Sequence, residues 1–407
     1  MGRTITILLI ITLISNKIYG QEEGELDQIK EDVKELKSLS ESNKPGKSGF
    51  LLRGYAHGGL EYHEADEELN FVFGAFNPIF LYRQSDKLFF EAELEFLFED
   101  DDLEVGLEFA NISYIVSKTL TIRAGKIFVP FGIFVERLHP AWINRLPTAP
   151  LGYGHDGVLP STDLGIEFRG AAYAGNLKYN YSFYLLNGPQ LNDGSEHEDD
   201  AGKLEYGKFS DNNNNKAVGG RFGIFPFSNS SLELGASAKF ATVGERESTF
   251  EDISSQLYAL DLSYVKAIPA IKSVIDIRAQ ANWVNVDNTD FIDTEDSTGT
   301  TTYTFDNKST SYFGQISLRP SFVGSNFLKN TEFVARFSNL ETPEGALWES
   351  NSTKWDFGLN YWLNWRTLIK ISYSSGKVEG GHDDEPGEGI DPATREDAFF
   401  IHWALGF

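Results

Sequence analysis

The residues of this sequence best suited to chemistry are charged side chains spaced within otherwise apolar segments. The most regular of them are Glu91, Glu93, Glu95, Arg123, Arg169 and Arg221. A spacing of two residues places side chains on one face of a β-strand. If that face meets water, a lining of mixed sign conducts hydrated ions and small polar solutes. The alternative is that the charges pair with one another and only brace a wall.

Catalytic, metal and nucleic-acid chemistry are not indicated. The 7 His residues are scattered singly without a Gly-x-Ser-x-Gly sequence nearby, so we expect no enzyme. The absence of Cys excludes disulfides and thiolate metal sites. The acidic segments Glu99–Asp102, Glu196–Asp200 and His382–Glu385 lack EF-hand spacing, which favours solvated charge over Ca²⁺ binding, and we expect no cofactor. The net charge of −25 argues against nucleic acid as a partner.

The elements that must position these charges are strands. From Phe50 to Phe407 the chain is a series of alternating apolar and polar segments of about ten residues, as in transmembrane β-barrels. In Leu88–Phe98, for example, apolar side chains occupy one face and Glu side chains the other. We predict an all-β fold, a transmembrane up-and-down antiparallel barrel. Its expected sixteen strands are 50–62, 69–82, 87–99, 103–116, 119–128, 162–175, 177–187, 217–227, 231–243, 256–266, 272–286, 309–321, 329–339, 353–363, 367–377 and 396–407.

The lengths of the connections between these segments alternate. The long connections are 130–161, 188–216, 243–255, 287–308, 340–352 and 378–395, and short turns lie between them. The first two connections of the long series, 63–68 and 100–102, are brief but acidic. Long extracellular loops that alternate with short periplasmic turns are typical of outer-membrane barrels. We therefore expect the chain in the outer membrane of a Gram-negative bacterium, in contact with membrane lipid and lipopolysaccharide.

The connection 129–161 is rich in Pro and apolar residues, which is unusual for a loop exposed to water. We expect it to fold into the barrel and to constrict the lumen. Arg137 and Arg145 are the candidate constriction residues, with His139 and Trp142 beside them. The alternative is that the two Arg side chains bind loop carbonyl groups and only hold the shape of the loop.

The charged residues divide unevenly along the chain. Glu91, Glu93 and Glu95 fall on the third segment and Glu108 on the fourth, whereas basic residues follow on later segments. We therefore expect one wall of the lumen to be negative and the region opposite to be more positive.

The two ends of the chain carry signals of their own. Residues 1–20 read as a secretory signal peptide, with Arg3 before an apolar run. Residues 21–49 form a short helical segment and linker, and the spacing within Glu22–Ser42 suits either a coiled coil or a solvated amphipathic leader. Residues 50–407 form the barrel domain. The final segment ends in Phe407 and resembles the C-terminal signal that the outer-membrane assembly machinery recognises in bacterial proteins.

A more specific resemblance lies just before the long connection 129–161. The segment from Arg123 to Ile133 reads RAGKIFVPFGI and is followed by Glu136 and Arg137. It resembles the phosphate-selective porin O and P family, in which such a strand runs into Pro-Phe-Gly and the third loop. The resemblance covers residues 50–407 and implies a homotrimer of sixteen-stranded barrels. Phosphate-selective members line the pore with Arg and Lys, whereas the lumen residues here are mixed in sign.

The sequence thus predicts an outer-membrane porin, a water-filled channel for the passive diffusion of small polar or ionic solutes. The alternative is a barrel closed by connection 129–161 that conducts nothing and acts as a surface adhesin or scaffold.

Overall fold

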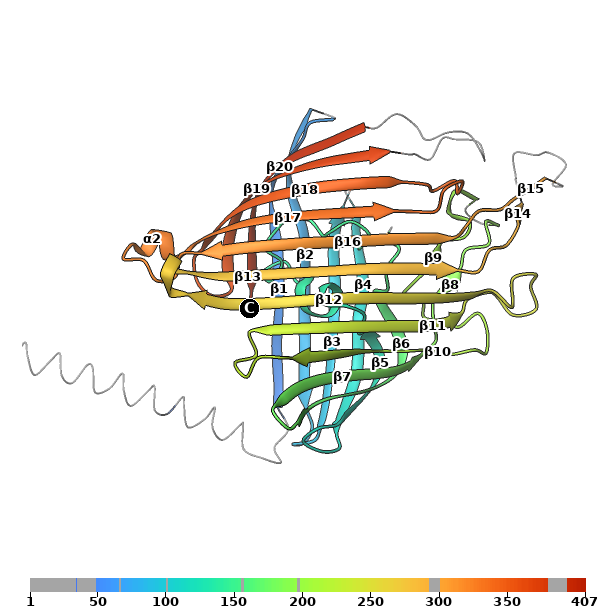
Figure 1. Cartoon of the computed structure of the whole chain (residues 1–407), viewed down its shortest axis with the longest axis horizontal. Coiled ribbons are helices and arrows are strands. Elements are labelled where there is room, and N and C mark those ends of the chain that lie inside the picture. Colours follow the sequence, from blue (N-terminus) through green and yellow to red (C-terminus); the bar gives the residue numbers. More distant parts are fainter. Residues whose placement is uncertain are drawn as a thin grey trace, which may run out of the picture.

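The computed structural model describes residues 34, 49–65, 67–99, 102–154, 157–195, 198–292, 301–379 and 394–407. In this part of the chain, sixteen antiparallel strands form a closed barrel in which β1 pairs with both β2 and β20 (Figure 1). The predicted up-and-down barrel and its number of strands are confirmed. The barrel strands are β1 (Gly49–His63), β2 (Glu68–Arg83), β3 (Leu88–Glu99), β4 (Asp102–Ile115), β5 (Thr121–Phe128), β6 (Thr162–Ala174), β7 (Leu177–Leu186), β10 (Ala217–Phe225), β11 (Leu232–Thr242), β12 (Ser254–Ile268), β13 (Ser273–Val286), β16 (Lys308–Arg319), β17 (Thr331–Glu341), β18 (Asn351–Trp362), β19 (Thr367–Glu379) and β20 (Thr394–Gly406).

The alternation of side chains gives the barrel an apolar outer face and a polar interior. In β20, Phe399, Ile401 and Trp403 are exposed, whereas the residues between them are buried. The largest fully buried side chains of the described residues include Arg336 and Lys239, which can be buried only where polar partners surround them. No described helix is long and apolar enough to cross a membrane.

The connections differ between the two ends of the barrel (Figure 1). Short turns lie at the end where β1 begins and β20 finishes, which we call the turn end, and long connections lie at the opposite loop end. The loop end carries two small two-stranded sheets that the sequence did not predict, because two-residue strands show no periodicity. The smaller elements are β8 (Gln190–Leu191), β9 (Leu204–Glu205), β14 (Phe291–Ile292), β15 (Thr302–Tyr303), α2 (Asn326–Lys329), η1 (Phe134–Leu138), η2 (Glu198–Asp200) and η3 (Pro269–Ile271).

The last residue of the chain helps to close the barrel. The backbone N–H of Gly54 donates to the carbonyl of Phe407 at 3.2 Å, and the N–H of Phe407 donates to the carbonyl of Gly54 at 2.9 Å. The Phe407 ring also stacks on Phe76, with the ring centroids 5.9 Å apart. The seam between β1 and β20 is therefore fastened at the turn end.

One irregularity of the sheet bears on the lumen. Along the β3–β4 pair, Glu93 lies opposite Phe109 and Leu94 lies opposite Leu107, so Glu108 has no partner in register. An extra residue of this kind is a β-bulge, which bends the strand and redirects a side chain.

The N-terminal predictions lie outside the described residues. The signal peptide 1–20 and, apart from residue 34, the helical segment Glu22–Ser42 fall within residues 1–33 and 35–48, which lie outside the described part of the chain.

Candidate functional site

Connection 129–161, called the inner loop below, leaves β5 and folds into the barrel. Its apolar side chains become buried there, and Val129, Ile133 and Leu146 are at most 1% exposed. The entry depends on Gly132, whose φ of +65° is favoured by glycine. A Cβ at this position would lie 1.9 Å from the Nε2 atom of Gln280, so the loop backbone lies directly against the wall. The composition that was unusual for an exposed loop thus belongs to an internal one.

Neutral side chains of the wall bind the first turn of the inner loop. The Oε1 atom of Gln280, on β13, accepts from the backbone N–H groups of Ile133 and Phe134 at 2.7 and 3.2 Å. The hydroxyl of Ser237, on β11, accepts from the N–H of Gly132 at 3.0 Å. These bonds satisfy three buried donors that would otherwise be costly to desolvate.

Donors on β17, β18 and β19 bind the second half of the inner loop through its carbonyl groups. Lys370, which is 2% exposed, donates to two of these carbonyls at 2.7 and 3.0 Å. The donors are Arg336, Lys354, Asn360 and Lys370. The acceptors are the carbonyls of Ala141, Arg145, Leu146, Thr148 and Ala149. Three cationic side chains of the wall, those of Arg336, Lys354 and Lys370, thus bind carbonyl groups of the inner loop.

The two candidate constriction residues bind carboxylates of the wall. Arg137 reaches Glu233 of β11 at 3.0 Å. Arg145 reaches Glu332 of β17 at 3.1 Å and Asp276 of β13 at 3.7 Å. Arg145 also donates to the carbonyl of Ile143 at 2.5 Å. This side chain therefore both pairs with wall carboxylates and binds a carbonyl group of the loop, as the alternative interpretation of the sequence expected. Both side chains remain partly exposed, at 33% and 22%.

Arg123 and Arg169 belong to one cluster with Glu91, Glu136 and Glu167. The guanidinium of Arg123 lies 2.7 Å from Glu167, 3.4 Å from Glu136 and 3.8 Å from Glu91. Arg169 lies 2.6 Å from Glu136. Burial alone would raise the pKa of Glu136, but Arg169 and Arg123 outweigh it and hold that pKa below its usual range. The inner loop is therefore tied to β5 and β6 by a charged carboxylate.

Arg221 forms a second buried cluster. Its guanidinium lies 2.6 Å from Asp261 and 3.0 Å from Glu233, the same carboxylate that receives Arg137. Among the described residues, Arg123, Arg169 and Arg221 are each paired with at least two carboxylates. The basic residues that were expected to make one region of the lumen positive are thus largely neutralised by neighbouring carboxylates.

His139 and Trp142 of the inner loop both pack against aromatic rings. His139 donates through Nδ1 to the carbonyl of Val135, and its ring lies 4.6 Å from that of Phe128 between centroids. Burial lowers the pKa of His139 to about 4, so the imidazole is neutral. Trp142 packs toward the turn end against Trp365, with centroids 6.2 Å apart.

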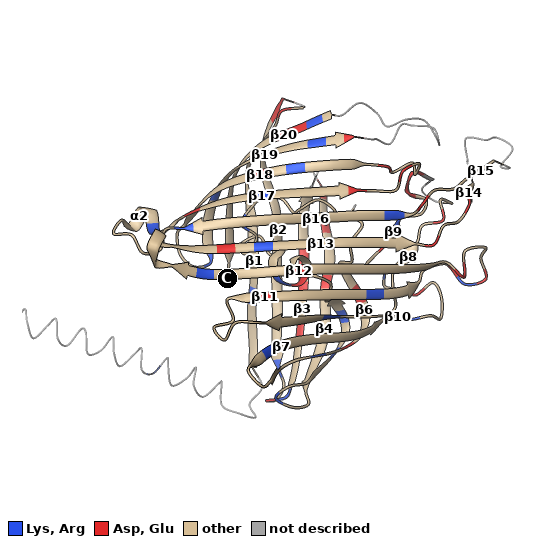
Figure 2. Ribbon diagram, viewed as in Figure 1, with Lys and Arg blue, Asp and Glu red and all other residues tan. Residues whose placement is uncertain are grey.

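The remaining predicted site residues lie on an acidic wall (Figure 2). Glu93 is buried and accepts from Tyr55 at 2.8 Å and from Asn77 at 3.3 Å. Glu95 accepts from Asn77 at 3.3 Å. The bulge residue Glu108 lies beside them and faces the same space as Glu95.

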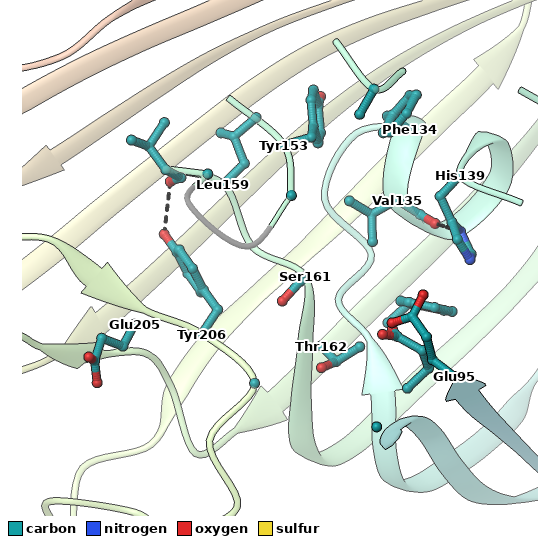
Figure 3. Close-up of a pocket in the computed structure, with 18 of the residues that line it drawn as sticks. Glu95, Phe134, Val135, His139, Tyr153, Leu159, Ser161, Thr162, Glu205 and Tyr206 are labelled. Carbon is teal, nitrogen blue, oxygen red and sulfur yellow. Dashed lines mark hydrogen bonds between the residues drawn. The ribbon is translucent and has the colours of Figure 1, made fainter. Parts of the chain in front are cut away.

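A cavity of about 730 Å³ lies between this wall and the inner loop. Figure 3 shows Glu95 on one side of it, near His139, and Glu205 and Tyr206 on another. Its walls come from β1 to β5, from the inner loop, and from connection 187–216. The cavity has both charged and apolar surfaces, which suits small polar solutes.

Sequence reasoning missed several residues of this site. Gln280 and Asn360 carry no charge, so alternation alone gave no reason to select them. Lys126 and Glu104 also line the cavity. Within the described ranges, no three His, Cys, Asp or Glu side chains are placed to hold one metal ion. The acidic segments weighed for Ca²⁺ lie partly or wholly outside those ranges.

Comparison with known proteins identifies the fold. No protein-family model matches the chain, and no curated protein matches its sequence. The outer membrane channel DcaP of Acinetobacter baumannii aligns at 10% identity and a TM-score of 0.57, over 88% of this chain and 97% of DcaP. An anion-selective porin from Comamonas acidovorans aligns at 12% identity and a TM-score of 0.54, over 89% and 100%. A trimer form of OmpT, an outer membrane protein of Vibrio cholerae, aligns at 11% identity and a TM-score of 0.50, over 88% and 99%. The chain therefore has the fold of the outer-membrane porins.

Proposed function

We propose that the chain is an outer-membrane porin, a water-filled channel for the passive diffusion of small polar or ionic solutes. One observation carries the proposal: the inner loop occupies part of a closed barrel and leaves a cavity of about 730 Å³ beside it. A barrel that served only as a scaffold would not need a polar cavity next to an ordered internal loop. The shared fold with porins and channels supports the same proposal.

In this proposal the inner loop forms the constriction. Its partly exposed Arg137 and Arg145 border the lumen, and His139 lines the cavity itself. Wall residues hold the loop backbone at many points, so the width of the passage is fixed rather than fluctuating. No catalytic step and no cofactor form part of the proposal.

The side chains on the outer face of the barrel indicate what surrounds the protein in this proposal. Exposed Phe, Trp, Leu and Ile side chains cover strands around the barrel, as contact with lipid requires. The turn end would face the periplasm and the loop end the cell exterior, next to lipopolysaccharide. The apolar face of β20 and its terminal Phe407 would be read by the assembly machinery.

We also propose that the chain forms a homotrimer. The trimer form of the similarly folded OmpT supports this, and the predicted coiled coil of Glu22–Ser42 would add contacts. Chemical cross-linking of the full chain in mild detergent should give a species of three chains. A purely monomeric product would refute the oligomeric state and leave the channel untouched.

The channel is tested by single-channel recording of the refolded protein in a planar bilayer. We expect stable ohmic steps. A variant in which Phe134–Pro147 is replaced by a short Gly-Ser linker should give larger steps, because the constriction is removed. Correctly folded protein without conductance would overturn the proposal and favour a surface adhesin or scaffold. Equal steps in both proteins would refute the role of the inner loop.

A further inference from the structure

The lumen of this barrel is divided into a covered side and an open side. The inner loop is bonded to β11, β13, β17, β18 and β19, as described above. Above that side, the long connections pack Phe291, Phe305 and Trp348 into one cluster with Ala201. The indole of Trp348 donates to the carbonyl of Ala201 at 2.8 Å. The cavity lies beside the inner loop, and its lining includes residues of β1 to β5 together with Val284, Ser309 and Trp348 of the covered side.

The Arg side chains of the covered side are paired with carboxylates. Arg336 lies 2.8 Å from Asp356, and Arg278 lies 2.5 Å from Asp276. Arg145 and Arg221 have the carboxylate partners given above, and Lys370 is held by two loop carbonyls. The Arg charges of this side are therefore matched by carboxylates, and Lys370 is covered by the inner loop.

Charges on the open side are not balanced. The cavity lining includes five carboxylates and three Lys residues. Two of these Lys side chains have partners beside them in the chain: Lys203 pairs with Asp200, and Lys208 lies 2.8 Å from Glu205. That leaves three carboxylates against one cation. The carboxylates are Glu95, Glu104 and Glu108.

The remaining cation, Lys126, forms no ion pair with these three carboxylates. Its Nζ atom donates to the carbonyl of Leu107 at 2.7 Å and lies 4.5 Å from the ring centroid of Phe209. Among the described residues, no Lys or Arg is within ion-pair distance of Glu95, Glu104 or Glu108. A positive charge in the cavity would therefore meet carboxylates that have no Lys or Arg within ion-pair distance.

Two residues of the cavity lining contain buried acceptor atoms without a hydrogen-bond partner. Asn77 is 0% exposed and lines the cavity, yet its Oδ1 atom has no hydrogen-bond partner. The Nε2 atom of His139 also has none, and because Nδ1 donates to Val135, Nε2 carries the lone pair. Buried polar atoms of folded proteins are rarely left unpaired, so each of these positions calls for a donor. An organic cation with N–H groups supplies such donors directly, whereas a bare anion does not.

We propose that the open side of the lumen selects cations, and that the solutes of this channel are small hydrated cations or small organic ammonium compounds. The inference rests on the proposed channel function and names its substrate class. Glu95, Glu104 and Glu108 set the preference, with Asn77 and His139 as neutral acceptors. This selectivity is opposite to that of the anion-selective porin with the same fold.

The test is the reversal potential of single channels in a KCl gradient. Wild-type channels should favour K⁺ over Cl⁻ by about fivefold or more, which corresponds to one unit charge at contact distance in water. The double variant Glu95→Gln with Glu108→Gln keeps the side-chain size and should bring the ratio close to one. Wild-type channels that prefer Cl⁻, or a double variant with an unchanged ratio, would overturn the proposal.

A matched control removes two carboxylates elsewhere at the loop end. Glu245 and Glu247 are exposed and do not line the cavity, so Glu245→Gln with Glu247→Gln should leave the ratio unchanged. If the first double variant does not fold, Lys126→Gln provides a second test, because removal of the one unbalanced cation should raise the K⁺ preference; a lowered preference would overturn the proposal. Absence of any current would refute the channel itself, whereas an anionic preference would refute only its substrate class.

Discussion

The substitution Gln280→Leu offers the sharpest test of how the inner loop is seated. Leu has nearly the volume of Gln but cannot accept the N–H groups of Ile133 and Phe134, which Gln280 binds at 2.7 and 3.2 Å. Each buried donor left without a partner costs about 1–3 kcal/mol, so docking of the loop should weaken by about 2–6 kcal/mol. At the lower bound of about 2 kcal/mol, the undocked population grows about 30-fold.

Limited trypsin digestion of the refolded protein measures this population. Arg137 and Arg145 are tryptic sites within the inner loop, and cleavage there requires undocking because both side chains are paired with the wall. Cleavage at these positions should accelerate at least about tenfold in the variant if opening is fast relative to cleavage. Gln315→Leu is the matched control, since Gln315 is paired in register on the neighbouring β16 and makes no side-chain bond to the loop. Equal cleavage rates in Gln280→Leu and wild type would refute the reasoning.

Three further predictions concern other contacts. Arg145→Met removes the cationic partner of Glu332 at 3.1 Å and leaves only the neutral donors Ser317 and Trp362, so loop docking should weaken by about 1–3 kcal/mol and the reversal potential should move toward cations; an unchanged potential would contradict this. Burial lowers the pKa of His139 from 6.5 to about 4, so the docked loop binds fewer protons and its hydrogen-exchange protection should fall as the pH drops from 6.5 toward 4. His139→Gln should abolish that dependence, and a variant that keeps it would exclude His139 as the cause. Deletion of Phe407 removes both backbone bonds to Gly54, so a smaller folded fraction should be seen by heat-modifiable electrophoretic mobility, and an equal fraction would show that the seam closes without them.

The barrel could be predicted because the pleat imposes a period of two along every strand. The segment expected at 177–187 is β7 (Leu177–Leu186), and that expected at 367–377 is β19 (Thr367–Glu379). Turn residues and apolar alternation mark such strands locally, without reference to distant parts of the chain. The same alternation placed Glu93 and Arg221 in the interior, where both are buried.

The site could be predicted only in part because its contacts are distant in sequence. Arg145 and Glu332 are 187 residues apart, and no local pattern joins them. The bulge that frees Glu108 depends on the register between β3 and β4, which side-chain type does not reveal. Composition indicated an internal loop, but not which wall would bind it, since that choice depends on neutral acceptors such as Gln280.

The way in which the wall holds the inner loop has a consequence for how this protein can change. The wall binds backbone amide and carbonyl groups, including the carbonyls of Ala141, Leu146 and Ala149, and every amino acid supplies these groups. Mutations of inner-loop side chains that make no bond to the wall can therefore leave the path of the loop intact. Natural variation or design can therefore change permeability through such side chains of the loop, while the sixteen-stranded barrel continues to fold as before.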